Sequence, residues 1–101
     1  MEIIGYARVS TQEQKLDMQL DALKKAGCTI IFEEKVSGVK QRPELEKALS
    51  YLREGDTFVV WKLDRLGRTL KELIFFIDDL NKRNIAFKSI SDGIDTNSAL
   101  G

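Results

Sequence analysis

Two short segments hold residues whose types and spacing could act together on a phosphate. The first is Arg8-Val9-Ser10, where a hydroxyl follows a guanidinium by two residues, and the second is the turn Lys62-Leu63-Asp64-Arg65-Leu66-Gly67-Arg68. Guanidinium groups bind phosphate oxygens in pairs and stay charged near pH 7. With Arg42 from a third segment, these positions offer one hydroxyl, four arginines, one lysine and one carboxylate.

The residue inventory narrows the chemistry further. The sequence has no histidine, which excludes a Ser-His-Asp triad, a Cys-His pair and a His-ligated metal. A serine hydroxyl is a poor nucleophile without a base. Phosphoryl transfer tolerates that lack better than acyl transfer, because its catalysis rests largely on positioning and on neutralising charge. Serine attack on a phosphodiester is therefore a coherent interpretation, although spacing alone does not name the substrate.

Anion binding by this chain must be local, because 16 Lys and Arg residues balance 16 Asp and Glu residues. Four cations crowd the expected start of one helix: Lys62, Arg65, Arg68 and Lys71. The helix dipole disfavours cations there, which suggests that an anionic ligand completes the site. Asp64, the only acid between residues 62 and 71, either orients the arginines or transfers a proton. Ser10 remains either a nucleophile or the N-terminal cap of a helix.

Hydrophobic periodicity and breaker residues predict alternating strands and helices that position these groups. Strands are expected at 2–9, 28–33, 57–61 and 85–90, and helices at 11–26, from Pro43 to a break at Gly55-Asp56, and at 69–82. Ser10 or Thr11 would cap the first helix and Gly27 would end it. Residues 36–41 read as a loop, 62–68 as a polar turn and 91–101 as a polar tail.

This order predicts an α/β fold whose central sheet is mostly parallel, has about four or five strands and carries helices on both faces. Ligand sites in such sheets lie beyond the carboxyl ends of the strands, where Ser10, Arg42 and the 62–68 turn would converge. The helix at 69–82 is apolar around much of its circumference. Part of it, around Phe75 or Phe76, either thickens the core or meets a subunit or further segment.

Size and composition bound the protein class. A chain of 101 residues forms one small domain, and 43% hydrophobic with 32% charged residues is typical of a globular protein. No apolar run approaches the roughly 20 residues of a membrane span, and the N-terminus lacks the pattern of a secretory signal. The single Cys28 cannot form an internal disulfide, which fits a cytoplasmic protein.

Two of these segments also resemble the signatures of a known family. Tyr6-Ala7-Arg8-Val9-Ser10-Thr11 is similar to the N-terminal signature of the resolvase/invertase serine recombinases, and residues 62–68 are similar to their second signature. Gly38, Arg42-Pro43-Glu44-Leu45 and the tail at 92–96 also fit the pattern. The resemblance runs along essentially the whole chain and is strongest to the DNA-invertase branch. It implies a resolvase-like catalytic domain.

The resemblance also implies a role for each candidate residue. Ser10 would attack the DNA backbone and form a 5′-phosphoserine intermediate, which is then religated without ATP, metal or any other cofactor. The implied catalytic set is Ser10, Arg8, Arg42, Arg65, Arg68, Asp64 and Lys62, with Arg42 on a mobile loop. Gln14, Gln19 and Lys71 would support the site or the DNA phosphates.

Family members act on DNA as dimers that pair into tetramers, with no membrane partner. They continue beyond the region of residues 97–101 into a long dimerisation helix and a helix-turn-helix domain. We therefore expect residues 1–101 to be a truncated catalytic domain that binds DNA weakly and does not recombine it unaided. Two alternatives stay open: a regulatory or assembly module whose chemistry has lapsed, and a nucleotide-binding α/β domain, which would lack a Gly-rich phosphate loop.

Overall fold

A computed structural model describes residues 2–10, 16–36, 43–67 and 69–96 of the chain. Its elements, in chain order, are β1 (Ile3–Ser10), α1 (Leu16–Lys25), β2 (Ile30–Val36), α2 (Pro43–Tyr51), β3 (Thr57–Val60), the short 3₁₀ helix η1 (Leu63–Arg65), α3 (Leu70–Lys82), β4 (Ala86–Ser89) and β5 (Ile94–Asp95). No helix within these described ranges is long and apolar enough to cross a membrane.

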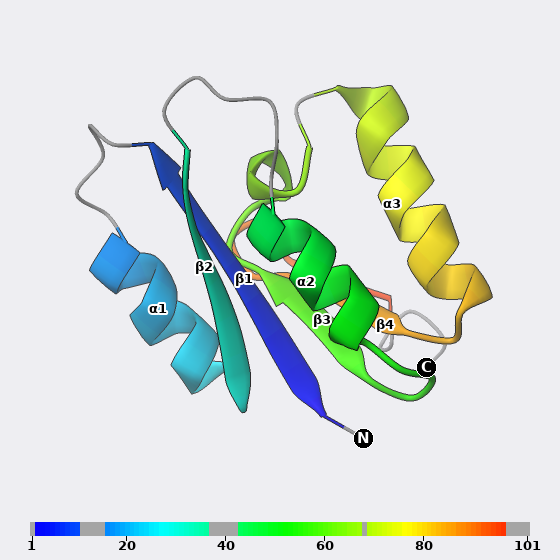
Figure 1. Ribbon diagram of the computed structural model, residues 1–101, viewed down its shortest axis with the longest axis horizontal. Coiled ribbons are helices and arrows are strands. Elements are labelled where there is room, and N and C mark those ends of the chain that lie inside the picture. Colours follow the sequence, from blue (N-terminus) through cyan, green and yellow to red (C-terminus); the bar gives the residue numbers. More distant parts are fainter. Residues whose placement is uncertain (1, 11–15, 37–42, 68, 97–101) are drawn as a thin grey trace.

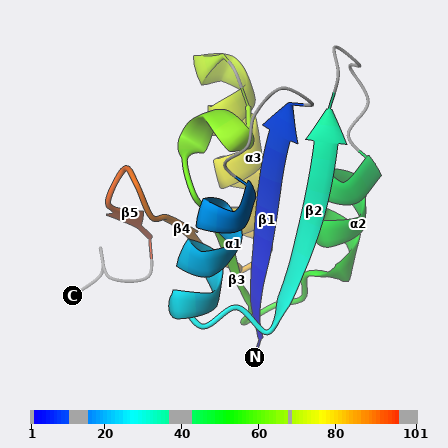
Figure 2. The ribbon, with the colours of Figure 1, turned by 90° about the vertical axis from the view of Figure 1, so that its left-hand side faces the viewer.

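The strands form one five-stranded sheet in the order β2-β1-β3-β4-β5. The first four strands are parallel and β5 is antiparallel to β4. Helix α1 covers one face of the sheet, and α2 and α3 cover the other (Figures 1 and 2). The predicted α/β class, the mostly parallel sheet and the helices on both faces are confirmed.

Residue alternation along β1 divides the core between the two faces. Ile4 and Tyr6 point to the face under α2 and α3, where they pack with Phe58 and other buried apolar side chains. Ala7 points to the other face, where it packs with Leu23 of α1. Because Arg8 continues the even-numbered series, it faces the α2 and α3 side of the sheet.

Local sequence signals set the helix ends. Helix α1 closes with Gly27 at φ 94°, and the N–H groups of Gly27 and Cys28 donate to the carbonyls of Lys24 and Leu23, the pattern of a Schellman cap. Pro43 opens α2, as predicted. The predicted start of the first helix at Thr11 lies outside the described residues, while Ser10 is the last residue of β1.

Two predicted strands differ from the structure. The strand expected at 28–33 corresponds to β2, which begins two residues later, at Ile30. It begins later because the Cys28 N–H is used in the cap of α1. It extends to Val36, which pairs with Ser10 at the end of the long strand β1 and is therefore not part of a loop. The tail expected from residue 91 is not purely irregular, since Ile94–Asp95 forms β5.

A turn with backbone pairing explains that extra strand. Gly93 adopts φ 69° and its N–H donates to the carbonyl of Ile90. Thr96 then donates its N–H to the carbonyl of Phe87 and accepts the Phe87 N–H on its hydroxyl oxygen. A two-residue strand held in this way leaves no periodicity in the sequence.

Helix α3 divides its aromatic residues between core and surface. Phe76 packs against the main core, whereas Phe75 is 67% exposed, beside the exposed Leu70 and Ile74. Of the two residues named, Phe76 thickens the core, whereas whether Phe75 meets a subunit or further segment stays a prediction.

Candidate active site

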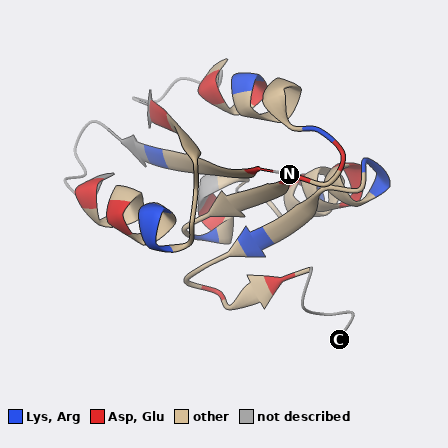
Figure 3. Cartoon of the chain, turned by 90° about the horizontal axis from the view of Figure 1, so that it is seen from below, with Lys and Arg blue, Asp and Glu red and all other residues tan. Residues whose placement is uncertain are grey.

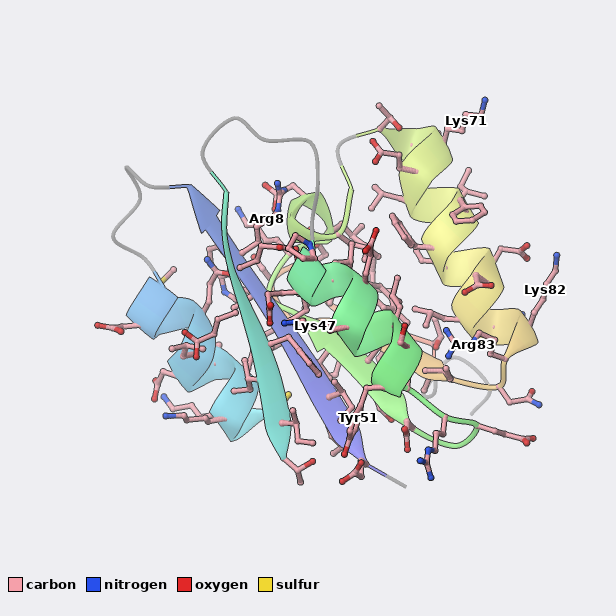
Figure 4. All side chains as sticks on the ribbon, viewed as in Figure 1. Arg8, Lys47, Tyr51, Lys71, Lys82 and Arg83 are labelled. Carbon is pink, nitrogen blue, oxygen red and sulfur yellow. The ribbon has the colours of Figure 1, made fainter. Side chains whose placement is uncertain are left out.

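The guanidinium of Arg8 joins the end of β1 to the turn after β3. Its Nη2 donates a hydrogen bond to the backbone carbonyl of Asp64 in η1. Arg8 is only 9% exposed, so its charge is held largely out of water. Figure 4 shows Arg8 beside η1, at the end of the sheet where β1 finishes. The first signature and the 62–68 turn were predicted to lie close together, and the contact between Arg8 and Asp64 shows that they do.

Ser10 lies two residues beyond Arg8, at the last position of β1. Strand pairing places Arg8 opposite Glu34 and Ser10 opposite Val36. The side chains of Ser10 and Arg65 lie outside the described part of the structure, although the backbone places Arg65 at the end of η1, directly after Asp64.

Gln19 holds the backbone of Arg8 through two hydrogen bonds. Its side chain is completely buried on α1, its Oε1 accepts the Arg8 N–H at 3.3 Å, and its Nε2 donates to the Arg8 carbonyl at 3.1 Å. Pairing of β1 with β3 ends at Tyr6, so Gln19 provides hydrogen bonds that the neighbouring strand no longer supplies. The supporting role expected for Gln19 in the site stays a prediction, and these two hydrogen bonds are what the structure shows of it.

The two lysines predicted for the site lie on different elements. Lys62 directly precedes η1, and its Nζ lies 5.1 Å from the centroid of the Trp61 ring, a cation–π distance. Lys71 is exposed at the outer tip of α3 and extends away from Arg8 (Figure 4). The structure places Lys62 at the start of η1 and Lys71 at the tip of α3, away from Arg8.

The start of α3 corrects one expectation about charge. Thr69 caps the helix by accepting the Glu72 N–H at 3.1 Å, and its hydroxyl also donates to the Glu72 carboxylate at 3.3 Å. Glu72 places a negative charge in the first turn, where the helix dipole favours it. The helix end therefore does not require an anionic ligand, and any phosphate site rests on the arginines.

Arg42, Arg68 and Gln14 were also predicted to belong to the site. All three positions lie outside the described residues. Their parts in the site stay predictions.

A buried carboxylate that the sequence interpretation missed lies next to Arg8. Glu34 lies on β2 and is 4% exposed. Its Oε1 accepts a hydrogen bond from the Tyr6 hydroxyl at 2.6 Å, and its Oε2 accepts one from the backbone N–H of Glu44 at 3.0 Å. It thereby fixes the first turn of α2, directly after the segment that holds Arg42. The available signal was alternation: Glu34 follows Phe32 by two, so it shares the inward face of a strand, where a charge needs partners.

The described residues carry positive and negative charges that are mixed along the chain, so an anion-binding site would have to be local. Acidic and basic residues are interspersed along the described helices (Figure 3). Several neutralise each other as neighbours on one helix, such as Lys25 with Asp21 and Lys82 with Asp78. Within the described ranges, no group of three or more Cys, Asp or Glu side chains is placed to hold a metal ion.

Comparison with known proteins gives one family. The family model described as "Resolvase, N terminal domain" matches residues 3–101. The DNA-invertase hin of Salmonella typhimurium is 52% identical over 102 residues, which cover 100% of this chain and 54% of that protein. The serine recombinase gin of Escherichia phage Mu is 54% identical over 100 residues, 98% of this chain and 52% of its own length.

Solved structures share the fold. A resolvase family site-specific recombinase from Streptococcus pneumoniae superposes with a TM-score of 0.75 at 20% identity, covering 96% of this chain and 76% of that one. The chain spans about half the length of the curated relatives it matches.

Proposed function

The chain belongs to the resolvase family, and from this we propose that it is the DNA-cleaving domain of a serine site-specific recombinase. The observation that carries the proposal is the hydrogen bond from Arg8 to the Asp64 carbonyl. It joins the strand that ends in Ser10 to the turn that carries Arg65. A serine position and an arginine-bearing turn therefore share one end of the sheet, which is where parallel sheets bind ligands.

The proposed reaction begins with attack by Ser10 on a DNA phosphodiester. The bond from its Oγ to phosphorus forms, the bond from phosphorus to the 3′ oxygen breaks, and the Oγ proton passes through solvent to that 3′ oxygen. The 3′ oxygen leaves as a hydroxyl, and the 5′ phosphate stays on the serine. Rejoining reverses these steps on a new 3′ hydroxyl. The phosphoester energy is kept in the covalent bond, so the cycle needs no cofactor.

The arginines would stabilise the negative charge that develops on the phosphate oxygens. Arg8 is held ready for this by its own burial and by the Asp64 carbonyl. We propose that Arg65, Arg68 and Arg42 complete the cluster with Gln14 as a supporting group, and that Lys71, apart from the cluster, contacts a DNA phosphate. We propose that the Asp64 carboxylate orients the arginines, while the backbone carbonyl of the same residue holds the Arg8 guanidinium.

Strand exchange requires more than cleavage. We propose that the full-length protein continues into a dimerisation helix and a helix-turn-helix domain, that it dimerises, and that two dimers pair on DNA. Inversion, as in the name of the Salmonella relative, is the reaction class that the sequence similarity favours. A DNA substrate would place the protein in the cytoplasm.

A trapping experiment tests the proposed cleavage. The full-length protein is incubated with a pool of short duplexes that carry one nick and randomised flanks. When the scissile phosphate lies a few bases from the nick, the freed 3′ fragment dissociates and religation stops. The adduct then survives denaturing electrophoresis.

We expect the wild-type protein to form this adduct and Ser10→Ala to form none while folding normally. Ser50→Ala, which removes an exposed serine on α2, is the matched control and should behave like the wild type. An adduct that persists in Ser10→Ala removes Ser10 from its role. No adduct from any variant would favour a regulatory module with lapsed chemistry.

A further inference from the structure

A carboxylate distant in the sequence caps the 3₁₀ helix that follows β3. Asp92 lies in the turn between β4 and β5, and its Oδ2 accepts the backbone N–H of Leu63 at 2.8 Å. Leu63 is the first residue of η1, and Lys62, at the N-cap position, makes no side-chain cap of its own. Asp92 therefore supplies, from 29 residues away, the acceptor that a helix start lacks.

Asp92 is itself held in place. The same Oδ2 accepts a hydrogen bond from the Ser89 hydroxyl at 2.7 Å, and Ser89 is completely buried at the end of β4. The hydrogen bond from Ser89 and then that from Leu63 lower the pKa of Asp92, against the opposing effect of burial. The carboxylate is thus charged at neutral pH, and hydrogen bonds to a charged acceptor are stronger than neutral ones.

The η1 helix connects the residue that Asp92 holds, Leu63, with the residue that Arg8 contacts, Asp64. The N–H groups of Leu66 and Gly67 both donate to the Leu63 carbonyl, and Leu66 is fully buried in the core. Between these two fixed ends stands Asp64, whose carbonyl accepts the Arg8 guanidinium. A rotation of η1 would move that carbonyl and the guanidinium together.

We propose that Asp92 is a positioning residue for DNA cleavage, which sets the orientation of η1 and thereby where Arg8 and Arg65 meet the phosphate. This inference rests on the function proposed above. The alternative is that Asp92 only stabilises the β4–β5 turn, in which case Arg8 would not respond to its loss.

Three variants separate these roles. Asp92→Ala removes the cap of η1, whereas Asp92→Asn keeps an oxygen that can accept from both Leu63 and Ser89. Ser91→Ala changes an exposed side chain in the same turn and is the control. Two quantities are measured on the full-length protein: the rate of covalent adduct formation and the NMR signals of the Arg8 guanidinium. Thermal midpoints are recorded for each variant.

We expect Asp92→Ala to slow adduct formation by roughly 10- to 100-fold, the scale of a small misplacement in an active site. The Arg8 guanidinium signals should shift in the same variant. Asp92→Asn should recover most of the rate and the wild-type signals, and Ser91→Ala should match the wild type. The inference is overturned if Arg8 signals stay unchanged in Asp92→Ala, or if Asn fails to rescue them.

The two proposals fail in different ways. If the wild-type protein forms no adduct, the proposed function fails, while the guanidinium signals still decide whether Asp92 positions Arg8. If the wild type forms the adduct and Asp92→Ala matches its rate, the positioning role fails alone. A rate loss in Asp92→Ala and Asp92→Asn alike, in step with their thermal midpoints, also contradicts positioning.

Discussion

The side-chain amide of Gln19 forms two hydrogen bonds with the backbone of Arg8, one to its N–H and one to its carbonyl. These two hydrogen bonds resemble those that a neighbouring strand would make. A residue of helix α1 supplies them because the pairing of β1 with β3 ends at Tyr6. It fixes the end of β1 two residues before Ser10. The position of Ser10, the proposed nucleophile, is therefore set from α1 as well as from the sheet.

Replacing Gln19 by Leu should cost both stability and activity. The substitution leaves a buried backbone N–H and carbonyl of Arg8 without their partner, at a cost of about 1–3 kcal/mol. We expect a lower urea midpoint and slower adduct formation. Met18→Ala, at an exposed position of the same helix, is the control and should do neither. Wild-type stability in Gln19→Leu would show that water replaces the amide.

Asp56 makes the stability of the fold depend on pH. Burial opposes its ionisation, but hydrogen bonds from the N–H groups of Glu2 and Arg53 outweigh burial and lower the pKa of Asp56. A carboxyl whose pKa is lower in the folded state stabilises the fold above its unfolded pKa of about 3.9, and loses this effect as pH falls through the folded value.

Urea unfolding of the wild type and Asp56→Asn at pH 7, 5 and 3 checks this. The wild type should be the more stable at pH 7 and 5, and the difference should shrink at pH 3. A difference that stays constant over this range would contradict the assignment to ionised Asp56.

Gly5 has no room for a side chain. A Cβ atom there would lie 2.9 Å from the Cys28 Sγ and 3.3 Å from a methyl carbon of Leu23. We expect Gly5→Ala to destabilise the fold by about 1–3 kcal/mol, as overpacking does. Adding Cys28→Ala removes the closest atom and should restore part of the loss, so the two changes should not be additive. Strict additivity would mean that the clash is not with Cys28.

Cys28 should react slowly in the folded protein. Burial raises the pKa of its thiol to about 11, with Lys88 opposing the shift. Because the thiolate is the reactive form, alkylation by iodoacetamide at pH 8 should be far slower in the native protein than in urea. The native rate should keep rising up to about pH 11. A plateau below pH 9 would contradict the raised pKa.

How much of the fold the sequence predicts depends on where each element takes its hydrogen bonds. Helices α2 and α3 begin where Pro43 and Thr69 indicate, because those signals are local. The start of β2 was wrong because a helix cap uses the Cys28 N–H, and β5 was missed because two residues carry no pattern.

The site shows the same division. Arg8 was expected at the end of β1, but its partner is the carbonyl of Asp64, and a backbone group leaves no mark in the sequence. Glu34 was missed because its partners, Tyr6 and the Glu44 N–H, come from separate segments. Side-chain types reveal candidate chemistry, whereas the contacts that orient them depend on the completed sheet.

Mapping the trapped adduct decides whether Ser10 is the residue that becomes joined to the DNA. Trypsin cleaves after Arg8 and Lys15, so Ser10 lies in a peptide of residues 9–15 that also holds Thr11. Mass spectrometry should find the 5′ phosphate of the DNA on this peptide, and fragmentation should assign it to Ser10, with Thr11→Val still forming the adduct. A phosphate on Thr11, on another peptide or linked through a 3′ end would contradict the account.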